Sequence, residues 1–199
     1  RTVLVVGAYL MHRLADPKDP MIFFYGDGAG AAVVEADSEP GFLGAAFRAD
    51  GRYAGHWGIY AGGTAEPASA ASVAAGRTRV RLLERYPPEV NEEGWQALVR
   101  ELAEQNQFGL DQIDHAVFTQ VNRYTIESVC DDLGIPRQRA PLTMGQWGYT
   151  GSACVPMALD ALLEKGRAAA GDLLVLIGSG VGYNMAGVAI RLTERLAGP

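Results

Sequence analysis

Two short stretches of this 199-residue chain gather hydroxyl, amide and thiol side chains that could take part in chemistry. The first is residues 119–122, Thr-Gln-Val-Asn, which follows an apolar tetrapeptide, residues 115–118, that is typical of a strand. The second, residues 148–156, carries Tyr149 and runs through small residues to Cys154, where a helix is predicted to begin. Hydroxyl groups can donate hydrogen bonds to a ligand, so both stretches are candidate parts of a functional site.

The individual groups differ in what they can do. Thr119 offers one weak hydroxyl donor and cannot act as a base near neutral pH, whereas Tyr149 offers one phenolic donor. Cys154 is the one candidate nucleophile in the sequence, because a helix start capped by Ser152 could lower the pKa of its thiol. Packing is the default interpretation of Cys154, and Cys130 is predicted to be a core residue on an apolar helical face.

A glycine-rich run at residues 26–31, Gly-Asp-Gly-Ala-Gly-Ala, fits the dinucleotide fingerprint. That fingerprint requires a helix directly after it, because the pyrophosphate sits on the helix N-terminus. Residues 32–35, Ala-Val-Val-Glu, favour a strand instead. Glycines in a strand usually mark a bulge or a close backbone approach, so we prefer that interpretation to nucleotide binding.

The elements that must position these groups can be predicted from periodicity. Apolar runs predict strands at residues 3–8, 21–25, 31–35, 42–47, 115–118, 173–177 and 186–192, the first of them buried in a parallel sheet. Apolar residues at helical spacing predict helices around Trp95, Ile126 and Leu159. Residues 49–76 are rich in Gly, Ala and Ser and are predicted to form a surface loop. Strands alternating with helices indicate a layered α/β domain.

Together these stretches resemble the ketoacyl synthase III branch of the thiolase superfamily. In that family the first loop reads His-Gln-Ala-Asn and the second begins Gly-Asn-Thr, so the His position falls on Thr119 and the Asn position on Tyr149. The resemblance implies a thiolase-like layered α/β/α fold that is present in part. Residues 1–37 would form the terminal strands of the N-terminal thiolase-like half, and residues 38–199 the C-terminal half.

The resemblance also implies where a thioester substrate would lie. Gly180 and Gly182 match a glycine loop that helps to form the oxyanion hole, and a plain turn is the alternative. Arg13 matches an arginine placed against the adenine of coenzyme A, although an exposed arginine is often only solvated. Trp95 matches an aromatic residue near the pantetheine channel, with helix core as the alternative. Asn122 matches the last residue of the family's first loop, which borders the pantetheine.

The nucleophilic cysteine of the family opens a helix upstream of the strand that matches residues 3–8. We therefore expect the nucleophile outside this chain, on an upstream segment or a partner chain, and expect that Arg1 does not start a natural open reading frame. A net charge of −6 without basic runs argues against a nucleic-acid or membrane surface. Two cysteines give neither a disulfide framework nor metal-ligand spacing, and a cytoplasmic location is expected.

Two functional hypotheses follow. In the first, the protein is a synthase III-like acyltransferase of fatty acid or polyketide type biosynthesis, acting on acyl-coenzyme A or acyl carrier protein thioesters. It would hold no covalently bound cofactor, would use a coenzyme A or phosphopantetheine thioester as substrate, and would form a homodimer or a heterodimer with another thiolase-fold chain. In the second, it is a non-catalytic thiolase-fold subunit that completes the dimer of an active synthase.

Overall fold

The computed structural model describes residues 1–39 and 41–193, and its centre is a four-stranded mixed sheet. The strand order is β3 (Phe42–Ala49), β8 (Asn184–Arg191), β7 (Leu173–Gly180) and β6 (His115–Phe118). β6 runs parallel to β7, and the other neighbours are antiparallel. Strand predictions for the segments 42–47, 115–118, 173–177 and 186–192 are thereby confirmed, with β7 reaching three residues further than predicted.

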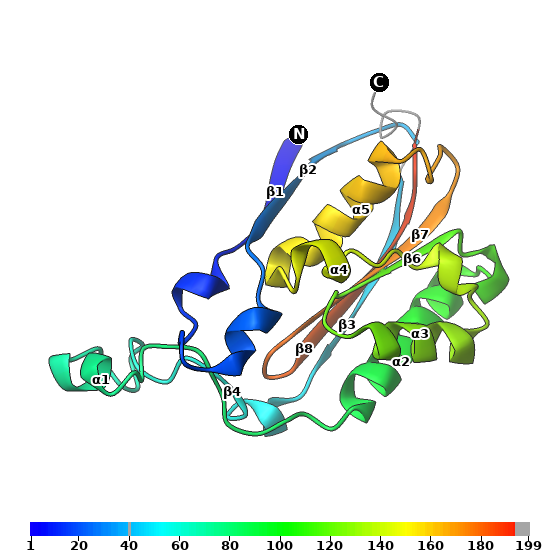
Figure 1. Cartoon of the computed structure of the whole chain (residues 1–199). Helices are drawn as coiled ribbons and strands as arrows, with labels where there is room; N and C mark the ends of the chain where they lie inside the picture. The colour runs from blue at the N-terminus through cyan, green and yellow to red at the C-terminus, as the bar shows by residue number, and fades with distance from the viewer. Residues whose placement is uncertain (40, 194–199) are drawn as a thin grey trace.

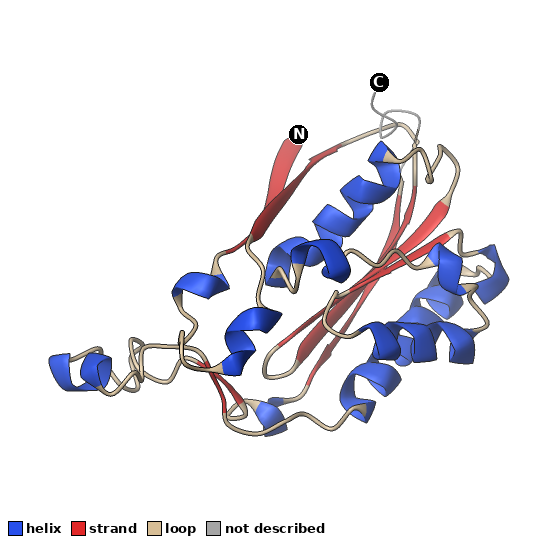
Figure 2. Cartoon of the chain, in the orientation of Figure 1, coloured by secondary structure: helices blue, strands red, loops and turns tan. Residues whose placement is uncertain are grey.

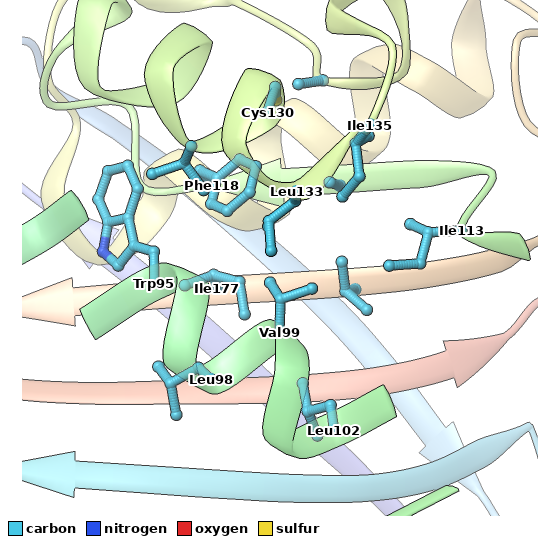
Figure 3. Packing of buried hydrophobic residues seen from close by; sticks show 14 of the residues in the cluster. Trp95, Leu98, Val99, Leu102, Ile113, Phe118, Cys130, Leu133, Ile135 and Ile177 are labelled. Atoms are coloured by element: carbon cyan, nitrogen blue, oxygen red, sulfur yellow. The ribbon is translucent and has the colours of Figure 1, made fainter. Parts of the chain in front are cut away.

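Helices cover both faces of this sheet, which gives the predicted layered α/β/α arrangement (Figure 1). On one face α2 (Glu89–Asn106) packs on β3, β8 and β7, with α3 (Arg123–Leu133) beside it. On the other face α5 (Cys154–Glu164) packs on β6 and β7. The core between α2, α3 and the sheet is made of fully or nearly fully buried apolar side chains (Figure 3), among them Trp95, Leu98, Val99, Leu102, Phe118, Cys130 and Ile177.

A separate two-stranded ribbon flanks α5 on its other side. β1 (Thr2–Tyr9) and β2 (Gly28–Glu35) pair antiparallel from Thr2 opposite Glu35 to Tyr9 opposite Gly28 (Figure 1). The prediction of a buried strand in a parallel sheet is therefore wrong for β1: its partner is antiparallel, and its apolar side chains at residues 3–6 are more than half exposed. An apolar run reports strand tendency, but it does not identify the neighbours that cover the strand.

The segment predicted as a strand at residues 21–25 is a 3-10 helix instead, Pro20–Phe24. Asp19 and Pro20 explain the difference: the Asp19 carboxylate accepts a hydrogen bond from the Met21 N–H, and the ring of Pro20 fixes a helical φ at the first position. The strand prediction at residues 31–35 is confirmed within β2, so the glycine-rich run leads into a strand and not a helix.

Between β3 and α2 the chain follows a long irregular course (Figure 2). It contains only a short hairpin, β4 (Trp57–Gly58) with β5 (Arg81–Leu82), a 3-10 turn at residues 51–53, and the short helix α1 (Ala70–Ala74). The Arg79 guanidinium donates to the Ala15 carbonyl, and Arg81 forms an ion pair with Asp16. These contacts tie the far end of the irregular segment to the loop after β1.

The helix predictions are confirmed, with one change of length and two missed helices. α2 spans 18 residues where periodicity predicted about a dozen, and neither α1, inside the predicted loop, nor α4 (Met144–Trp147) was predicted. The division after residue 37 stays a prediction. Within the described residues, no helix combines the length and apolar character needed to cross a membrane.

Candidate active site

A cavity of about 840 Å³ lies where the end of β1, the irregular segment, the 149–155 loop and strands β7 and β8 meet. Its walls are mostly apolar, and none of the described residues that line it carries a formal charge. The lining includes Tyr9, Trp57, Ile59, Thr119, Tyr149, Cys154, Val155, Leu176, Ser179, Gly180 and Val188. Both sequence stretches singled out as candidate parts of a functional site therefore border one cavity.

Thr119 lies at the end of β6 with only 2% of its surface exposed. Its hydroxyl bridges the backbone of β7: it donates to the Ile177 carbonyl at 3.3 Å and accepts from the Ser179 N–H at 2.7 Å. The single hydroxyl proton is therefore already used. In this arrangement Thr119 holds two strand ends together and does not offer a free donor to the cavity.

Gln120 fixes the shape of the loop that Thr119 opens. Its buried side-chain amide donates to the carbonyls of Phe118 at 2.9 Å and Pro141 at 3.1 Å. Its oxygen accepts from the Thr143 N–H at 2.7 Å and, more weakly, from the Met144 N–H at 3.3 Å. This one side chain joins the end of β6 to the segment that leads to Tyr149.

Tyr149 is held through its backbone. Its N–H donates to the Phe24 carbonyl at 3.0 Å, and its carbonyl accepts from the Gly26 N–H at 2.9 Å. Its ring packs against Phe24 and against the edge of the Tyr9 ring, with centroids 5.0 and 5.7 Å away. Burial raises the pKa of the Tyr149 phenol well above its ordinary value.

Tyr9 is a cavity residue that the sequence analysis missed. It is the last residue of β1, and burial together with the neighbouring Tyr149 raises the pKa of its phenol well above the ordinary value. The ring rests directly on Gly151, whose backbone has a φ of +49° and where a Cβ would lie 2.2 Å from the ring. The only available signal was its position at the end of a predicted strand.

Cys154 is the first residue of α5 and borders the cavity, although only 2% of its surface is exposed. Its sulfur accepts a hydrogen bond from the Gln120 N–H at 3.4 Å. Burial outweighs this hydrogen bond and raises the pKa of the thiol, the opposite of what a nucleophile requires. The predicted Ser152 cap is wrong: the cap position is Ala153, and the Ser152 hydroxyl donates to the Ala8 carbonyl at 2.9 Å.

The two glycines of the expected oxyanion loop differ in their relation to the cavity. Gly180 ends β7 and lines the cavity. Gly182 lies in the following turn, does not line the cavity, and donates its N–H to the Tyr86 hydroxyl at 3.3 Å. Its φ of +136° is a conformation that favours glycine.

The three residues expected to contact a coenzyme lie away from the cavity. Trp95 is completely buried and stacks on Phe118 with centroids 5.3 Å apart, as the core interpretation expects, so it cannot touch a ligand in this structure. Asn122 caps α3 by accepting from the Tyr124 N–H at 2.8 Å. Arg13 is exposed in the 3-10 turn after β1. Among the described residues, no three His, Cys, Asp or Glu side chains are grouped to hold a metal.

Comparison with known proteins gives these features a family. Residues 103–192 match the model of the 3-oxoacyl-[acyl-carrier-protein] synthase III C-terminal region, and residues 1–51 match the model of 3-oxoacyl-[acyl-carrier-protein] synthase III. The beta-ketoacyl-[acyl-carrier-protein] synthase III of Gloeobacter violaceus is 36% identical over 189 residues, covering 92% of this chain and 57% of the relative.

Solved structures agree in fold. A crystal structure of a 3-oxoacyl-(acyl-carrier-protein) synthase III superposes with a TM-score of 0.86 at 27% identity, over 96% of this chain and 60% of the other. The priming beta-ketosynthase of the R1128 polyketide pathway gives 0.80 at 28% identity, over 97% and 57%. The layered α/β/α arrangement and these superpositions define the class as a thiolase-like α/β fold. The chain belongs to the ketoacyl synthase III-like branch of the thiolase superfamily and spans less than two thirds of these relatives.

Proposed function

We propose that this chain forms the C-terminal part of an acyltransferase that acts on acyl-coenzyme A or acyl carrier protein thioesters. The observation that carries the proposal is the uncharged cavity bordered by both Thr119 and Tyr149. An apolar cavity of this kind suits an acyl chain, because burying its methylene groups is favourable, at roughly 0.8 kcal/mol each. A substrate with an ionised chain would find no opposite charge there.

Simple acyl transfer is favoured over decarboxylative condensation. Condensation in the family relies on the His and Asn donors that hold the developing enolate, and both positions are exchanged here. Thr119 cannot take over the role of His, because its hydroxyl is already bonded to the backbone of β7. The nucleophilic cysteine is expected on a segment outside this chain. We also propose that the protein is dimeric and is located in the cytoplasm.

The test uses the complete protein that contains this chain, radiolabelled butyryl-coenzyme A and a carrier protein bearing phosphopantetheine. We expect label to move to the carrier thiol, and expect little carbon dioxide release when a malonyl thioester is supplied. Val188→Phe, which places a ring in the cavity, should reduce transfer. Ile190→Phe, on the same strand but outside the cavity lining, is the matched control. Robust condensation with the malonyl thioester would overturn the proposal.

The alternative, a non-catalytic subunit, is favoured by the same exchange of donors. A protein of that kind would transfer no label under any condition. It would instead co-purify with a second thiolase-fold chain. The synthase activity of that partner would be the same in complex with the wild-type protein and with the Val188→Phe variant. The labelled transfer assay therefore separates the two hypotheses.

A further inference from the structure

Two phenolic hydroxyls in the cavity wall have no hydrogen-bond partner among the described residues. They belong to Tyr9 and Tyr149, whose rings meet edge to face. Tyr25, a third phenol nearby, differs in both respects: its hydroxyl accepts from the Trp57 indole N–H at 3.0 Å, and it does not line the cavity. The cavity is therefore lined by two tyrosines whose hydroxyls are unpaired among the described residues and whose rings are in contact.

We propose that the hydroxyls of Tyr9 and Tyr149 form the donor pair that binds the thioester carbonyl oxygen in this protein. This inference rests on the proposed acyl transfer and assigns the role of oxyanion stabilisation to residues of this chain. Thr119 is excluded from that role by its bonds to Ile177 and Ser179. Gly182 is excluded as well, because its N–H is bonded to Tyr86.

The position of both rings is fixed by the surrounding backbone. Tyr149 is held from both sides by the backbone of Phe24 and Gly26. Tyr9 is fixed because the end of β1 lies directly on the turn before α5: a Cβ at Gly7 would lie 2.3 Å from the Ser152 carbonyl oxygen. Donors that are fixed before the substrate binds need little reorganisation during the reaction, which is the condition for effective electrostatic stabilisation.

The protonation state of the pair suits this role. Burial raises the pKa of both phenols above the ordinary value near 10, so both remain neutral donors at physiological pH. A buried neutral acid that donates to an oxyanion is an established arrangement in other enzymes. A phenolate would instead repel the developing charge.

Acyl transfer proceeds by addition to the thioester carbonyl and elimination of the leaving thiolate. An attacking thiolate adds its lone pair to the carbonyl carbon, and the C=O π pair moves to oxygen, which becomes an alkoxide that accepts hydrogen bonds from both phenols. The alkoxide then re-forms the double bond, the C–S bond breaks, and the leaving sulfur departs as a thiolate with its electron pair. Both phenolic protons stay on tyrosine, and no oxidant or metal is needed.

The experiment removes each hydroxyl and keeps each ring. Tyr9→Phe and Tyr149→Phe are compared with Tyr25→Phe in the complete protein, using the butyryl-coenzyme A transfer assay. Each of the first two variants should lose about 100-fold in kcat, and the double variant should lose more. Tyr25→Phe should keep wild-type kcat. Wild-type kcat in both single cavity variants would overturn the proposal.

A second measurement does not depend on turnover. Infrared difference spectra of butyryl-coenzyme A labelled with carbon-13 at the carbonyl report the hydrogen bonding of the bound thioester. We expect the wild-type protein to shift the carbonyl band to lower frequency, and expect Tyr9→Phe and Tyr149→Phe to return part of that shift. A bound thioester with an unshifted band, or no binding at all, would refute the donor pair.

The two measurements separate the two proposals. A shifted band without transfer would support the donor pair and contradict the acyltransferase function. Transfer with an unshifted band, and no loss in either phenylalanine variant, would support the function and contradict the donor pair. Thermal melts of all variants exclude misfolding as the reason for a lost activity.

Discussion

The two loops that border the cavity use their hydroxyl groups in opposite ways. The Thr119 hydroxyl is hydrogen-bonded to the backbone of β7, whereas Tyr149 is held by its own backbone and its hydroxyl has no hydrogen-bond partner in the part of the chain that the structure describes. The difference shows that facing a cavity does not make a side chain available to a ligand. A group is available only when its hydrogen-bonding capacity is not consumed by the fold.

The largest expected effect comes from disturbing the Tyr149 side of this comparison. Gly151→Ala should destabilise the protein by about 3 kcal/mol, because alanine disfavours the positive φ and its methyl group would collide with the Tyr9 ring. Gly145→Ala, in α4 with open space around it, is the control and should change little. Urea unfolding measures both. Equal stability of the two variants would contradict the packing described for Tyr9.

On the Thr119 side the expected cost is smaller and structural. Thr119→Val keeps the shape but leaves the Ser179 N–H without its acceptor, which should lower the free energy of unfolding by about 2 kcal/mol. Thr119→Ser keeps the hydroxyl and should lose only about 1 kcal/mol. If Thr119→Val unfolded like the wild type but lost transfer activity, Thr119 would belong with Tyr149 as a ligand-binding residue.

Alkaline pH should lower the stability that the neutral phenols of Tyr9 and Tyr149 contribute to the fold. In the unfolded chain a tyrosine ionises near pH 10, but in the fold both phenols ionise only at higher pH. Their contribution to stability is therefore complete below pH 10 and is lost as the pH rises above it. The Tyr9→Phe, Tyr149→Phe double variant should lose less of its Tm between pH 9 and 11 than the wild type does. An identical decline in both proteins would argue against neutral, buried phenols.

The smallest effect concerns the two thiols. Burial raises the pKa of Cys130 to about 11 and also raises the pKa of Cys154, so both should react with iodoacetamide at pH 8 more slowly than a free thiol, Cys130 by at least about tenfold. Cys154 should be the faster of the two, because it borders the cavity whereas Cys130 lies in the core. Peptide mapping after timed alkylation gives both rates. If Cys154 reacted as fast as glutathione, the result would support Cys154 as a nucleophile.

Periodicity located the sheet and the long helices because their burial repeats at fixed spacing, as in α2, where Trp95, Leu98 and Val99 share one face. It failed where a local side-chain contact decides the backbone, as at Asp19 and Pro20. The family resemblance located the two loops, but it could not tell that the Thr119 hydroxyl is bonded to β7. Tyr9 escaped notice because its partners are more than 100 residues away in sequence.

The hydrogen bonds of Gln120 set the course of the loop independently of most of the side chains along it. Its amide must donate on one side and accept on the other, so a carboxylate or an apolar side chain could not satisfy the same four backbone groups. The geometry of the loop is thus set by one buried side chain that does not line the cavity. Conservative exchanges at its two ends, such as Thr119→Ser and Tyr149→Phe, should therefore leave the course of the loop unchanged. In this chain the course of the loop and the chemistry of its ends are thus set largely by different side chains.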